Sequence, residues 1–263
     1  MEIQGNVANQ QTSFEQNYQE VDFSKWFFHT TKDPFIRYLR DRRMKIAIDF
    51  ILKELSTTIE AIQDWKVLIV CGGVGGEGRY LANRGFRSVT ISDFSENALT
   101  MCRRMDSRLQ TLLLNAEKID LEDNTFDLVM VQDGLHHLPR PALGLTEMLR
   151  VSRKAVVVIE PHTSLVGTLV GTEWERQDGS VNYVFRWNQN ILEQITKSCL
   201  LFNTTCIKAI QLWDHNLVIN KTASKFPKEM KLSVAKFIYA ILNLFSKVGN
   251  MMVGVVIKGN SKA

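Results

Sequence analysis

The chain has 263 residues, of which 45% are hydrophobic and 23% are charged, a composition that indicates a folded globular protein and excludes extensive disorder. Its formal net charge of +4 is small for this length and does not favour nucleic-acid binding, which needs concentrated positive charge. The four cysteines are widely separated, without the close pairs of a zinc site or a disulfide framework, so we expect a cytoplasmic protein.

Residues 1–33 are polar and aromatic with little periodicity, and we treat them as an N-terminal arm that precedes one domain over residues 34–263. The start of the arm has neither the basic residues nor the apolar core of a signal peptide. The longest uncharged runs, 237–246 and 248–257, are about half as long as a membrane-spanning helix. The sequence therefore predicts no spanning segment.

A long helix is expected to begin at Asp33-Pro34, because proline fits the first turn of a helix. Its apolar residues recur at helical spacing, at Ile36, Leu39, Ile46, Phe50, Ile51 and Leu55. The same helix carries Arg37, Arg40, Arg42, Arg43 and Lys45. These cations could meet a phosphate or an acidic lipid, but we expect them to form a solvated face.

From about residue 66 to 161, apolar runs alternate with helical segments. The runs cover residues 67–70, 88–92, 112–116, 126–132 and 155–160, and the intervening helices end near residue 84 or cover 95–105 and 141–151. Continuous apolar strands separated by helices predict a parallel sheet that is covered on both faces. Such sheets bind ligands beyond the carboxyl ends of the strands, where the strand order reverses.

A glycine-rich turn follows the first of these strands, in the stretch VLIVCGGVGGEGRYLA (67–82). Gly73, Gly75 and Gly78 form a GxGxxG pattern, whose bare backbone lets a ligand approach closely. Asp93 stands at the end of the next strand, where a carboxylate can hold a ribose diol. The combination predicts a cofactor that contains adenosine, whereas the glycines alone would also suit a tight turn.

The chain from about Lys66 to Pro161 resembles the Rossmann-like (class I) S-adenosylmethionine-dependent methyltransferases, especially their small-molecule branch. VLIVCGGVGGEGRYLA is similar to the first motif of that family, and ISDFSENAL (91–99) to the segment with the ribose-binding acid. LNAEKIDLEDNTFDLVMVQDGLHHL (114–138) resembles the adenine segment, the fourth strand and the loop after it. The resemblance implies a doubly wound, mostly parallel seven-stranded α/β sheet with an antiparallel last strand and a helical N-terminal cover.

The resemblance also implies S-adenosylmethionine as the cofactor and a set of residues that hold it. The set comprises Cys71, Gly72, Gly73 and Gly75 in the turn, Asp93 at the ribose, Phe94 on the adenine, Asn115, Ala116 and Glu117 at the adenine edge, and Gln132 beneath the cofactor. Ile69 and Cys71 depart from the family, which usually has an acid and a glycine there. Asn115 replaces the usual aspartate, but its carbonyl can still accept from the adenine amine.

These features predict methyl transfer to a small-molecule acceptor, of aromatic, sugar or lipid-like character, at oxygen, nitrogen or carbon. The two departures leave open a methyltransferase-like binding or regulatory protein without turnover. A less favoured alternative is an NAD-dependent oxidoreductase, which would share the glycines and Asp93. Against it, no second nucleotide-binding half follows, and no Tyr-xxx-Lys pair stands after a fourth strand.

The candidate catalytic residues are Asp133, His136 and His137, in the loop QDGLHHLPRP (132–141) just past the fourth strand. Methyl transfer needs chiefly alignment of the nucleophile, and a general base helps when the acceptor is a hydroxyl. Many members of the family that the chain resembles carry a histidine pair here that caps a helix, so His136 and His137 can instead have that structural role. No metal site is expected, because the histidine and acidic residues come from two loops without close ligand spacing.

Two segments outside the common core, residues 163–190 and 221–249, are expected to form the lid or the substrate site. The first contains Trp174, Tyr183, Phe185, Arg186 and Trp187, which suit a flat ring or a sugar and equally a packed lid. The second is predicted as a helix ending at Gly249, between last strands at 203–213 and 251–258. Its apolar residues are Leu232, Phe237, Ile241, Leu244 and Phe245, for which core packing or a dimer contact is favoured over an acceptor wall or a membrane surface.

Overall fold

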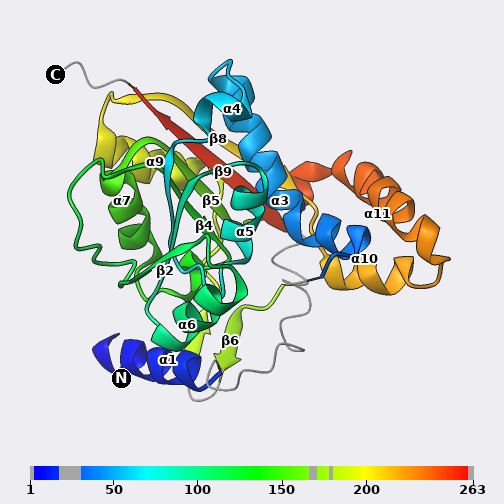
Figure 1. Cartoon of the computed structure of the whole chain (residues 1–263), viewed down its shortest axis with the longest axis horizontal. Helices are drawn as coiled ribbons and strands as arrows, with labels where there is room; N and C mark the ends of the chain where they lie inside the picture. Colours follow the sequence, from blue (N-terminus) through cyan, green and yellow to red (C-terminus); the bar gives the residue numbers. More distant parts are fainter. Residues whose placement is uncertain (1–2, 18–30, 166–170, 178–179, 260–263) are drawn as a thin grey trace.

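A central sheet with helices on both faces organises the computed structural model, which describes residues 3–17, 31–165, 171–177 and 180–259 (Figure 1). Its strands are β1 (Lys66–Ile69), β2 (Ser88–Asp93), β3 (Gln110–Leu113), β4 (Phe126–Gln132), β5 (Ser152–Pro161), β8 (Thr204–Leu212) and β9 (Met251–Lys258). The helices are α1 (Ile3–Asn17), α3 (Pro34–Glu54), α4 (Ile59–Ile62), α5 (Gly76–Asn83), α6 (Glu96–Met105), α7 (Pro141–Val151), α9 (Gln189–Leu200), α10 (Asn216–Ala223) and α11 (Lys228–Asn243), with 3-10 turns η1 (Leu135–His137) and η2 (Ser246–Val248). A separate hairpin pairs β6 (Trp174–Gln177) with β7 (Ser180–Tyr183).

The strand order in the sheet is β3-β2-β1-β4-β5-β9-β8. β1 pairs in parallel with both β2 and β4, so the chain order reverses between β1 and β4. β9 is antiparallel to both of its neighbours, β5 and β8. This arrangement confirms the predicted mostly parallel, seven-stranded sheet with an antiparallel last strand, and the switch point is where such sheets bind ligands.

The apolar strands are continuous in sequence because alternate residues face opposite helical layers. Val67 and Ile69 belong to one core cluster with apolar residues of α3, α5 and α6. Leu68 and Val70 belong to the other, with residues of α7 and α9. Each strand therefore buries both of its faces, as expected of a parallel sheet between two helical layers.

Polar residues at the predicted helix starts cap the helices. Asp33 accepts hydrogen bonds from the backbone N–H groups of Phe35 (2.8 Å) and Ile36 (3.4 Å), and Pro34 opens α3. Ser95 accepts from Ala98 N–H at the start of α6. These side chains satisfy N–H groups that have no partner within the helix, which fixes where the helices begin.

The chain beyond the common core forms a lobe in which α10 and α11 pack against the start of α3. Phe35 and Leu39 of α3, Ile219 of α10 and Tyr239 of α11 form a small cluster separate from the two main ones. The lobe projects from the side of the sheet that carries α3 (Figure 1). In this way α3 links the sheet to the lobe.

Several predicted elements differ from the structure in extent or kind. The third strand ends at Leu113, so Asn115 and Ala116 belong to the following turn. The arm contains α1, a helix that the weak periodicity of residues 1–33 did not indicate; of its described side chains, Gln10 and Ser13 are buried and most of the others are exposed. The helix expected to reach Gly249 ends at Asn243 and is followed by η2. Parts of the expected lid at 163–190 lie outside the described residues.

Candidate active site

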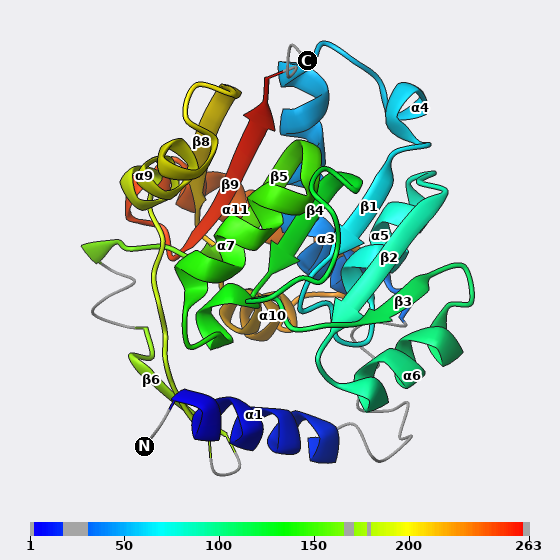
Figure 2. The same cartoon turned by 90° about the vertical axis from the view of Figure 1, so that its left-hand side faces the viewer.

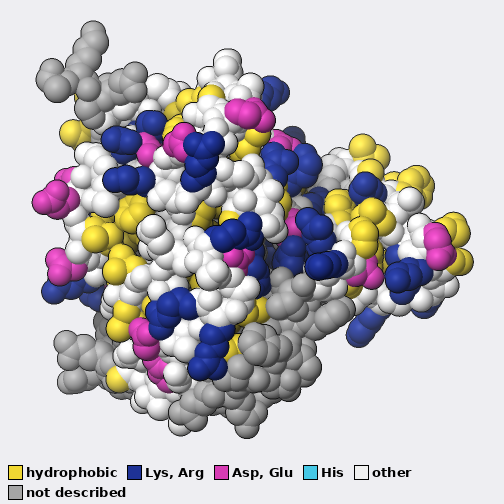
Figure 3. Space-filling view, viewed as in Figure 1, with side chains coloured by type: hydrophobic (Ala, Val, Ile, Leu, Met, Phe, Trp, Pro, Cys, Tyr) yellow, Lys and Arg dark blue, Asp and Glu magenta, His cyan; other side chains and the backbone are white. Residues whose placement is uncertain are grey.

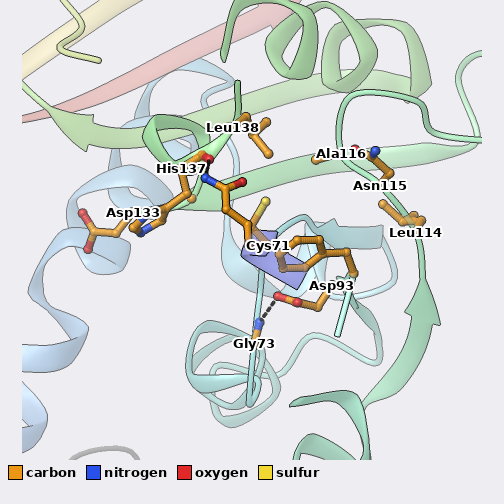
Figure 4. A pocket seen from close by; sticks show the side chains of 12 residues that line it. Cys71, Gly73, Asp93, Leu114, Asn115, Ala116, Asp133, His137 and Leu138 are labelled. Atoms are coloured by element: carbon orange, nitrogen blue, oxygen red, sulfur yellow. Dashed lines mark hydrogen bonds between the residues drawn. The ribbon is translucent and has the colours of Figure 1, made fainter. Parts of the chain in front are cut away.

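A cavity opens at the switch point, beyond the carboxyl ends of β1, β2, β3 and β4. Residues from all four strand ends and from α1 line it: Gln10, Cys71, Gly73, Asp93, Phe94, Leu114, Asn115, Ala116, Asp133, Gly134, His137 and Leu138. Figure 4 shows Leu114 and Asn115 at one end of the cavity and Asp133 at the other. Asn115, a predicted adenine residue, and Asp133, a predicted catalytic residue, thus lie at opposite ends of one cavity.

The glycine turn and Asp93 are hydrogen-bonded to each other. One Asp93 carboxylate oxygen accepts from Gly73 N–H at 2.9 Å, and the other accepts from Ser95 N–H at 3.0 Å. Gly73 has a φ of 49°, a left-handed conformation that favours glycine. Burial raises the pKa of Asp93, and the backbone N–H groups oppose that rise. Asp93 therefore shapes the turn while its carboxylate faces the cavity.

Two of the predicted turn glycines do not line the cavity but pack beneath it. A Cβ on Gly75, whose φ is 78°, would lie 2.5 Å from Cys102 Sγ of α6. A Cβ on Gly72 would lie 2.7 Å from an Ile91 methyl group. At these positions the absence of a side chain lets the turn fit against β2 and α6, which is a packing role.

Cys71 lines the cavity at the position where the resembling family usually has glycine. Its φ of 52° is left-handed, which explains why glycine suits this position. Burial, followed by the charges of Asp93, Glu160 and Glu117, raises the pKa of the Cys71 thiol well above its usual range. The thiol therefore stays protonated. Ile69, the other departure, is buried in the core and does not line the cavity.

At the predicted adenine edge, Phe94, Asn115 and Ala116 line the cavity and Glu117 does not. The Asn115 side-chain oxygen accepts from Glu117 N–H at 2.8 Å, which closes a local turn. The buried Glu117 carboxylate accepts from Arg140 N–H and from the Arg140 guanidinium. Glu117 therefore holds the loop before α7, whereas Asn115 is exposed at the predicted adenine edge of the cavity.

Gln132 ends β4 as predicted but lies outside the lining. Its amide N–H₂ donates to Glu77 at 2.9 Å, and its amide oxygen is buried without a hydrogen-bond partner among the described residues. Burial raises the pKa of Glu77, and the charge of Asp133 also raises it. Gln132 is thus held by Glu77 beside the cavity rather than within its lining.

Asp133 lines the cavity and is bound by Arg43 of α3. Arg43 also pairs with Asp214, which is fully buried and accepts a hydrogen bond from Tyr239 of α11. The expectation that the α3 cations form a solvated face is thus wrong for Arg42 and Arg43. Arg42 is buried over the Tyr239 ring, because the lobe packs on this side of α3.

His136 is buried and paired with Glu160 at the end of β5. Its Nδ1 lies 2.6 Å from one oxygen of the Glu160 carboxylate, and the other oxygen accepts from Gly134 N–H and Leu135 N–H. Burial lowers the pKa of His136, but the hydrogen bond and charge of Glu160 outweigh it and raise the pKa. Glu160 thereby holds the loop after β4 in place. His136 contributes to this contact and does not line the cavity.

His137 lines the cavity, and its tautomer follows from its neighbours. Asn182 of β7 donates its amide N–H₂ to His137 Nδ1 at 3.0 Å, and its amide oxygen accepts from Gln10 of α1 at 2.7 Å. Burial, and then the charge of His136, lowers the pKa of His137 to about 4. The neutral ring therefore carries its proton on Nε2, as a donor rather than a base.

Among the described residues, one group has the composition of a metal site. His136, His137 and Glu175 of the hairpin have ligand atoms within 4.8 Å of one another. The Nδ1 atoms of both histidines already have protein partners, Glu160 and Asn182. No metal is needed to satisfy these two nitrogens, and the absence of a metal stays a prediction.

The aromatic segment divides between the lid and the core. Trp187 is fully buried and Phe185 packs edge-on against it, with ring centroids 5.0 Å apart. Trp174 and Tyr183 form an exposed pair across the hairpin. Phe185 and Trp187 thus pack in the core, Trp174 and Tyr183 are exposed, and the lid role of this segment stays a prediction.

α1 closes the cavity from the side opposite the sheet, where it runs along the strand ends (Figure 2). Glu15 accepts hydrogen bonds from Glu96 N–H and Asn97 N–H at the first turn of α6, where the helix dipole favours a negative charge. Gln10 donates to the His137 backbone carbonyl at 3.0 Å. Gln10, Asn182, Glu175 and Arg43 were not singled out as site residues, since no local pattern marks contacts between such distant segments.

Sequence comparison places residues 68–159 in the family described as a methyltransferase domain. The ubiquinone/menaquinone biosynthesis C-methyltransferase of Roseobacter denitrificans is 32% identical over 108 residues, which are 36% of this chain and 43% of that protein. The demethylmenaquinone methyltransferase of Clavibacter sepedonicus is 34% identical over 89 residues, 33% of this chain and 36% of that one. The match thus spans less than half the length of these relatives.

Similar solved structures extend the likeness to nearly the whole chain. A possible histamine N-methyltransferase from Thermotoga maritima has a TM-score of 0.56 at 16% identity, covering 94% of this chain and 99% of that one. The 1,6-didemethyltoxoflavin-N1-methyltransferase of Burkholderia thailandensis, solved with its namesake compound and S-adenosylhomocysteine, has a TM-score of 0.56 at 14% identity and covers 98% and 91%. The predicted resemblance is confirmed: residues 68–159 match a methyltransferase domain, and the chain shares the overall fold of these solved methyltransferases.

Proposed function

We propose that the protein transfers a methyl group from S-adenosylmethionine to a small-molecule acceptor in the cavity at the β1–β4 switch point. The observation that carries this proposal is the pairing of Asp93 with Gly73 N–H inside that cavity. It joins the two parts of the predicted adenosine site, the glycine turn and the acid, in one hydrogen-bonded unit. The match of residues 68–159 to a methyltransferase domain supports the choice of cofactor.

The residues present fit an adenosyl ligand from one end of the cavity to the other. Asp93 would hold the ribose through its carboxylate, and Phe94 and Ala116 would pack against the adenine. The backbone at Gly73 would border the methionine part. When bound, S-adenosylmethionine supplies a methyl group that its sulfonium already activates.

The other end of the cavity would position the acceptor. His137 presents an imidazole whose Nδ1 accepts from Asn182, so its Nε2–H can donate to an acceptor oxygen or nitrogen. Asp133 offers a carboxylate that Arg43 holds in place. Alignment of the acceptor behind the methyl group is the main contribution we assign to these residues, worth up to about 7 to 11 kcal/mol in favourable cases.

An aromatic, sugar or lipid-like acceptor would suit the exposed Trp174 and Tyr183 pair on the hairpin beside Glu175. The named relatives methylate quinone precursors, and the solved neighbour carries a toxoflavin precursor, so acceptor chemistry varies around this fold. A cytoplasmic location is supported by the four free cysteines, which suit a reducing compartment.

A second candidate function is cofactor binding without turnover. It is favoured by the state of the candidate bases: Arg43 holds Asp133, Glu160 holds His136, and the pKa of His137 is lowered to about 4. An acceptor hydroxyl would then find Asp133 and His136 already held by other side chains, and His137 a weak base. An acceptor that is nucleophilic in its neutral form would still react.

Calorimetry with S-adenosylmethionine, S-adenosylhomocysteine and NAD tests the proposal. We expect S-adenosylmethionine and S-adenosylhomocysteine to bind and to raise the melting temperature. NAD should not bind and should leave the melting temperature unchanged. Incubation with cofactor labelled in its methyl group, together with a small-molecule extract, should then yield a labelled product. Cofactor binding without any labelled product would favour the non-catalytic candidate, and binding of NAD alone would refute both.

A further inference from the structure

A row of large apolar side chains on α11 and η2 faces solvent. The row, which we call the α11 face, comprises Met230, Phe237, Ile241, Leu244, Phe245 and Val248, with exposed fractions of 50%, 67%, 45%, 79%, 66% and 37%. It lies on the projecting lobe, where apolar and basic side chains are interspersed (Figure 3). Of the two favoured expectations, core packing is wrong for Phe237, Ile241, Leu244 and Phe245, whereas Leu232 packs against the lobe cluster and a dimer contact stays a prediction. We propose that the α11 face docks on the surface of a lipid bilayer that contains anionic lipids.

The spacing of these residues sets them on one side of the helix. Met230, Phe237, Ile241 and Leu244 follow one another at intervals of seven, four and three residues, which places them on a single stripe of a helix with 3.6 residues per turn. The opposite stripe, with Ala235 and Tyr239, is buried against α3 and α10. α11 is therefore apolar on two faces, and the lobe uses only one of them for its own core.

The charge around the α11 face matches an anionic membrane surface. Residues 221–248 contain six lysines, Lys221, Lys225, Lys228, Lys231, Lys236 and Lys247, and one acid, Glu229. The segment thus carries a net charge of +5, against +4 for the whole chain, so the remainder sums to −1. At 100° per residue, Lys231 and Lys236 flank the apolar stripe on opposite sides, where long side chains can reach lipid headgroups.

The same charge disfavours a second copy of the chain as the occupant. In a two-fold symmetric pair, the α11 faces would meet with the same lysines at each rim, and like charges across an interface are repulsive. The helix is also too short to cross a bilayer: α11 has 16 residues, and no described helix is both long and apolar enough to span one. An amphipathic helix with lysines beside an apolar stripe instead lies in the plane of the interface.

The helix that carries the α11 face is linked by side chains to the acceptor end of the cavity. Tyr239, on the buried side of α11, donates to Asp214, and Asp214 pairs with Arg43. Arg43 in turn holds Asp133, which lines the cavity. The buried side of α11 thus connects to the site through a short chain of side chains, although the proposal itself does not depend on the reaction catalysed there.

Co-sedimentation of the full chain with vesicles tests this proposal. We expect binding to vesicles of phosphatidylcholine mixed with phosphatidylglycerol, and at least tenfold weaker binding to phosphatidylcholine alone. The double variant Phe237→Ser/Leu244→Ser should lose binding to the mixed vesicles. Phe202→Ser is the matched control, because Phe202 is fully exposed but lies before β8, away from the lobe, and this change should leave binding intact.

A second pair of substitutions tests the charge. Lys231→Gln/Lys236→Gln should weaken binding to the mixed vesicles by on the order of tenfold and reduce its dependence on salt. Melting temperatures of all variants verify that the lobe stays folded. Binding that is unchanged by the double serine variant would overturn the proposal. The proposal would also be overturned if the wild type bound no vesicles, formed a dimer in light scattering and became monomeric in the double serine variant. The α11 face would then join two copies of the chain.

Discussion

The two ends of the cavity are built by different means. At the cofactor end, backbone N–H groups, glycines and short turns between consecutive strands and helices form the site, as in the pairing of Asp93 with Gly73. At the acceptor end, side chains from α1, α3 and β7 converge on the loop after β4, as in the contacts of Gln10, Arg43 and Asn182. Local sequence determines the first end, and long-range packing determines the second.

The largest expected effect is at Gly75, on the cofactor side. Gly75→Val should lower the free energy of unfolding by about 2 to 5 kcal/mol, because it combines a left-handed backbone with a Cβ that would meet Cys102 Sγ at 2.5 Å. Gly85→Val is the matched control, since Gly85 has a φ of 102° and nothing within 4 Å of an added Cβ. Urea denaturation of both variants measures the difference, and equal losses would show that backbone strain alone matters.

The anchor of the acceptor loop should come next in size. Glu160→Gln removes the charge that accepts from Gly134 N–H, Leu135 N–H and His136, and should cost about 1.5 to 3 kcal/mol of stability at neutral pH. The pKa of His136 is raised in the folded protein, so the stability that this pair contributes is present below about pH 6.5 and is lost as pH rises through the folded pKa.

Denaturation of the wild type and Glu160→Gln across that pH range checks this prediction. The difference in free energy of unfolding between the two proteins should be largest at pH values below the His136 transition and should become smaller above it. A gap that does not change with pH would mean that the charge of His136 contributes nothing to the anchor.

His137 should contribute a smaller pH dependence of stability, opposite in direction to that of the His136–Glu160 pair. Its folded pKa of about 4 lies below the usual histidine value of about 6.5, so the unfolded chain takes up a proton first and stability falls as pH decreases between these values. His137→Asn should remove that part of the fall, about 1 kcal/mol near pH 5 after allowing for the partial exposure of the ring. Identical pH profiles for the two proteins would show that His137 titrates normally.

The sequence predicted the sheet and the glycine turn after β1 for the same physical reason. The run 126–132 becomes β4 with the same bounds, and Ser95 and Pro34 mark helix starts through local capping geometry. The glycines indicated the turn correctly but not their separate tasks: Gly73 lines the cavity, whereas Gly75 fits against α6. That division depends on what each missing Cβ would meet, which local sequence does not encode.

The acceptor end could not be predicted in the same way. Arg43 was interpreted as a solvated cation because its neighbours on α3 are basic, and only the packing of the lobe shows that it pairs with Asp133 and Asp214. Glu175 and Asn182 lie in a hairpin whose short strands carry no clear alternation, and α1 has too weak a pattern to be placed over the cavity. Contacts between such distant segments have no local signature.

The most direct measurement compares the binding of two ligands to the wild type and to Asp93→Ala. This comparison separates ribose binding by Asp93 from its support of the glycine turn. Calorimetry would compare S-adenosylhomocysteine with its analogue lacking the ribose hydroxyls, on the wild type and on Asp93→Ala. If the carboxylate holds the ribose, Asp93→Ala should weaken S-adenosylhomocysteine by on the order of ten- to a hundredfold and leave the analogue almost unchanged. An equal loss for both ligands, or no loss for either in a folded variant, would contradict the proposed cofactor site.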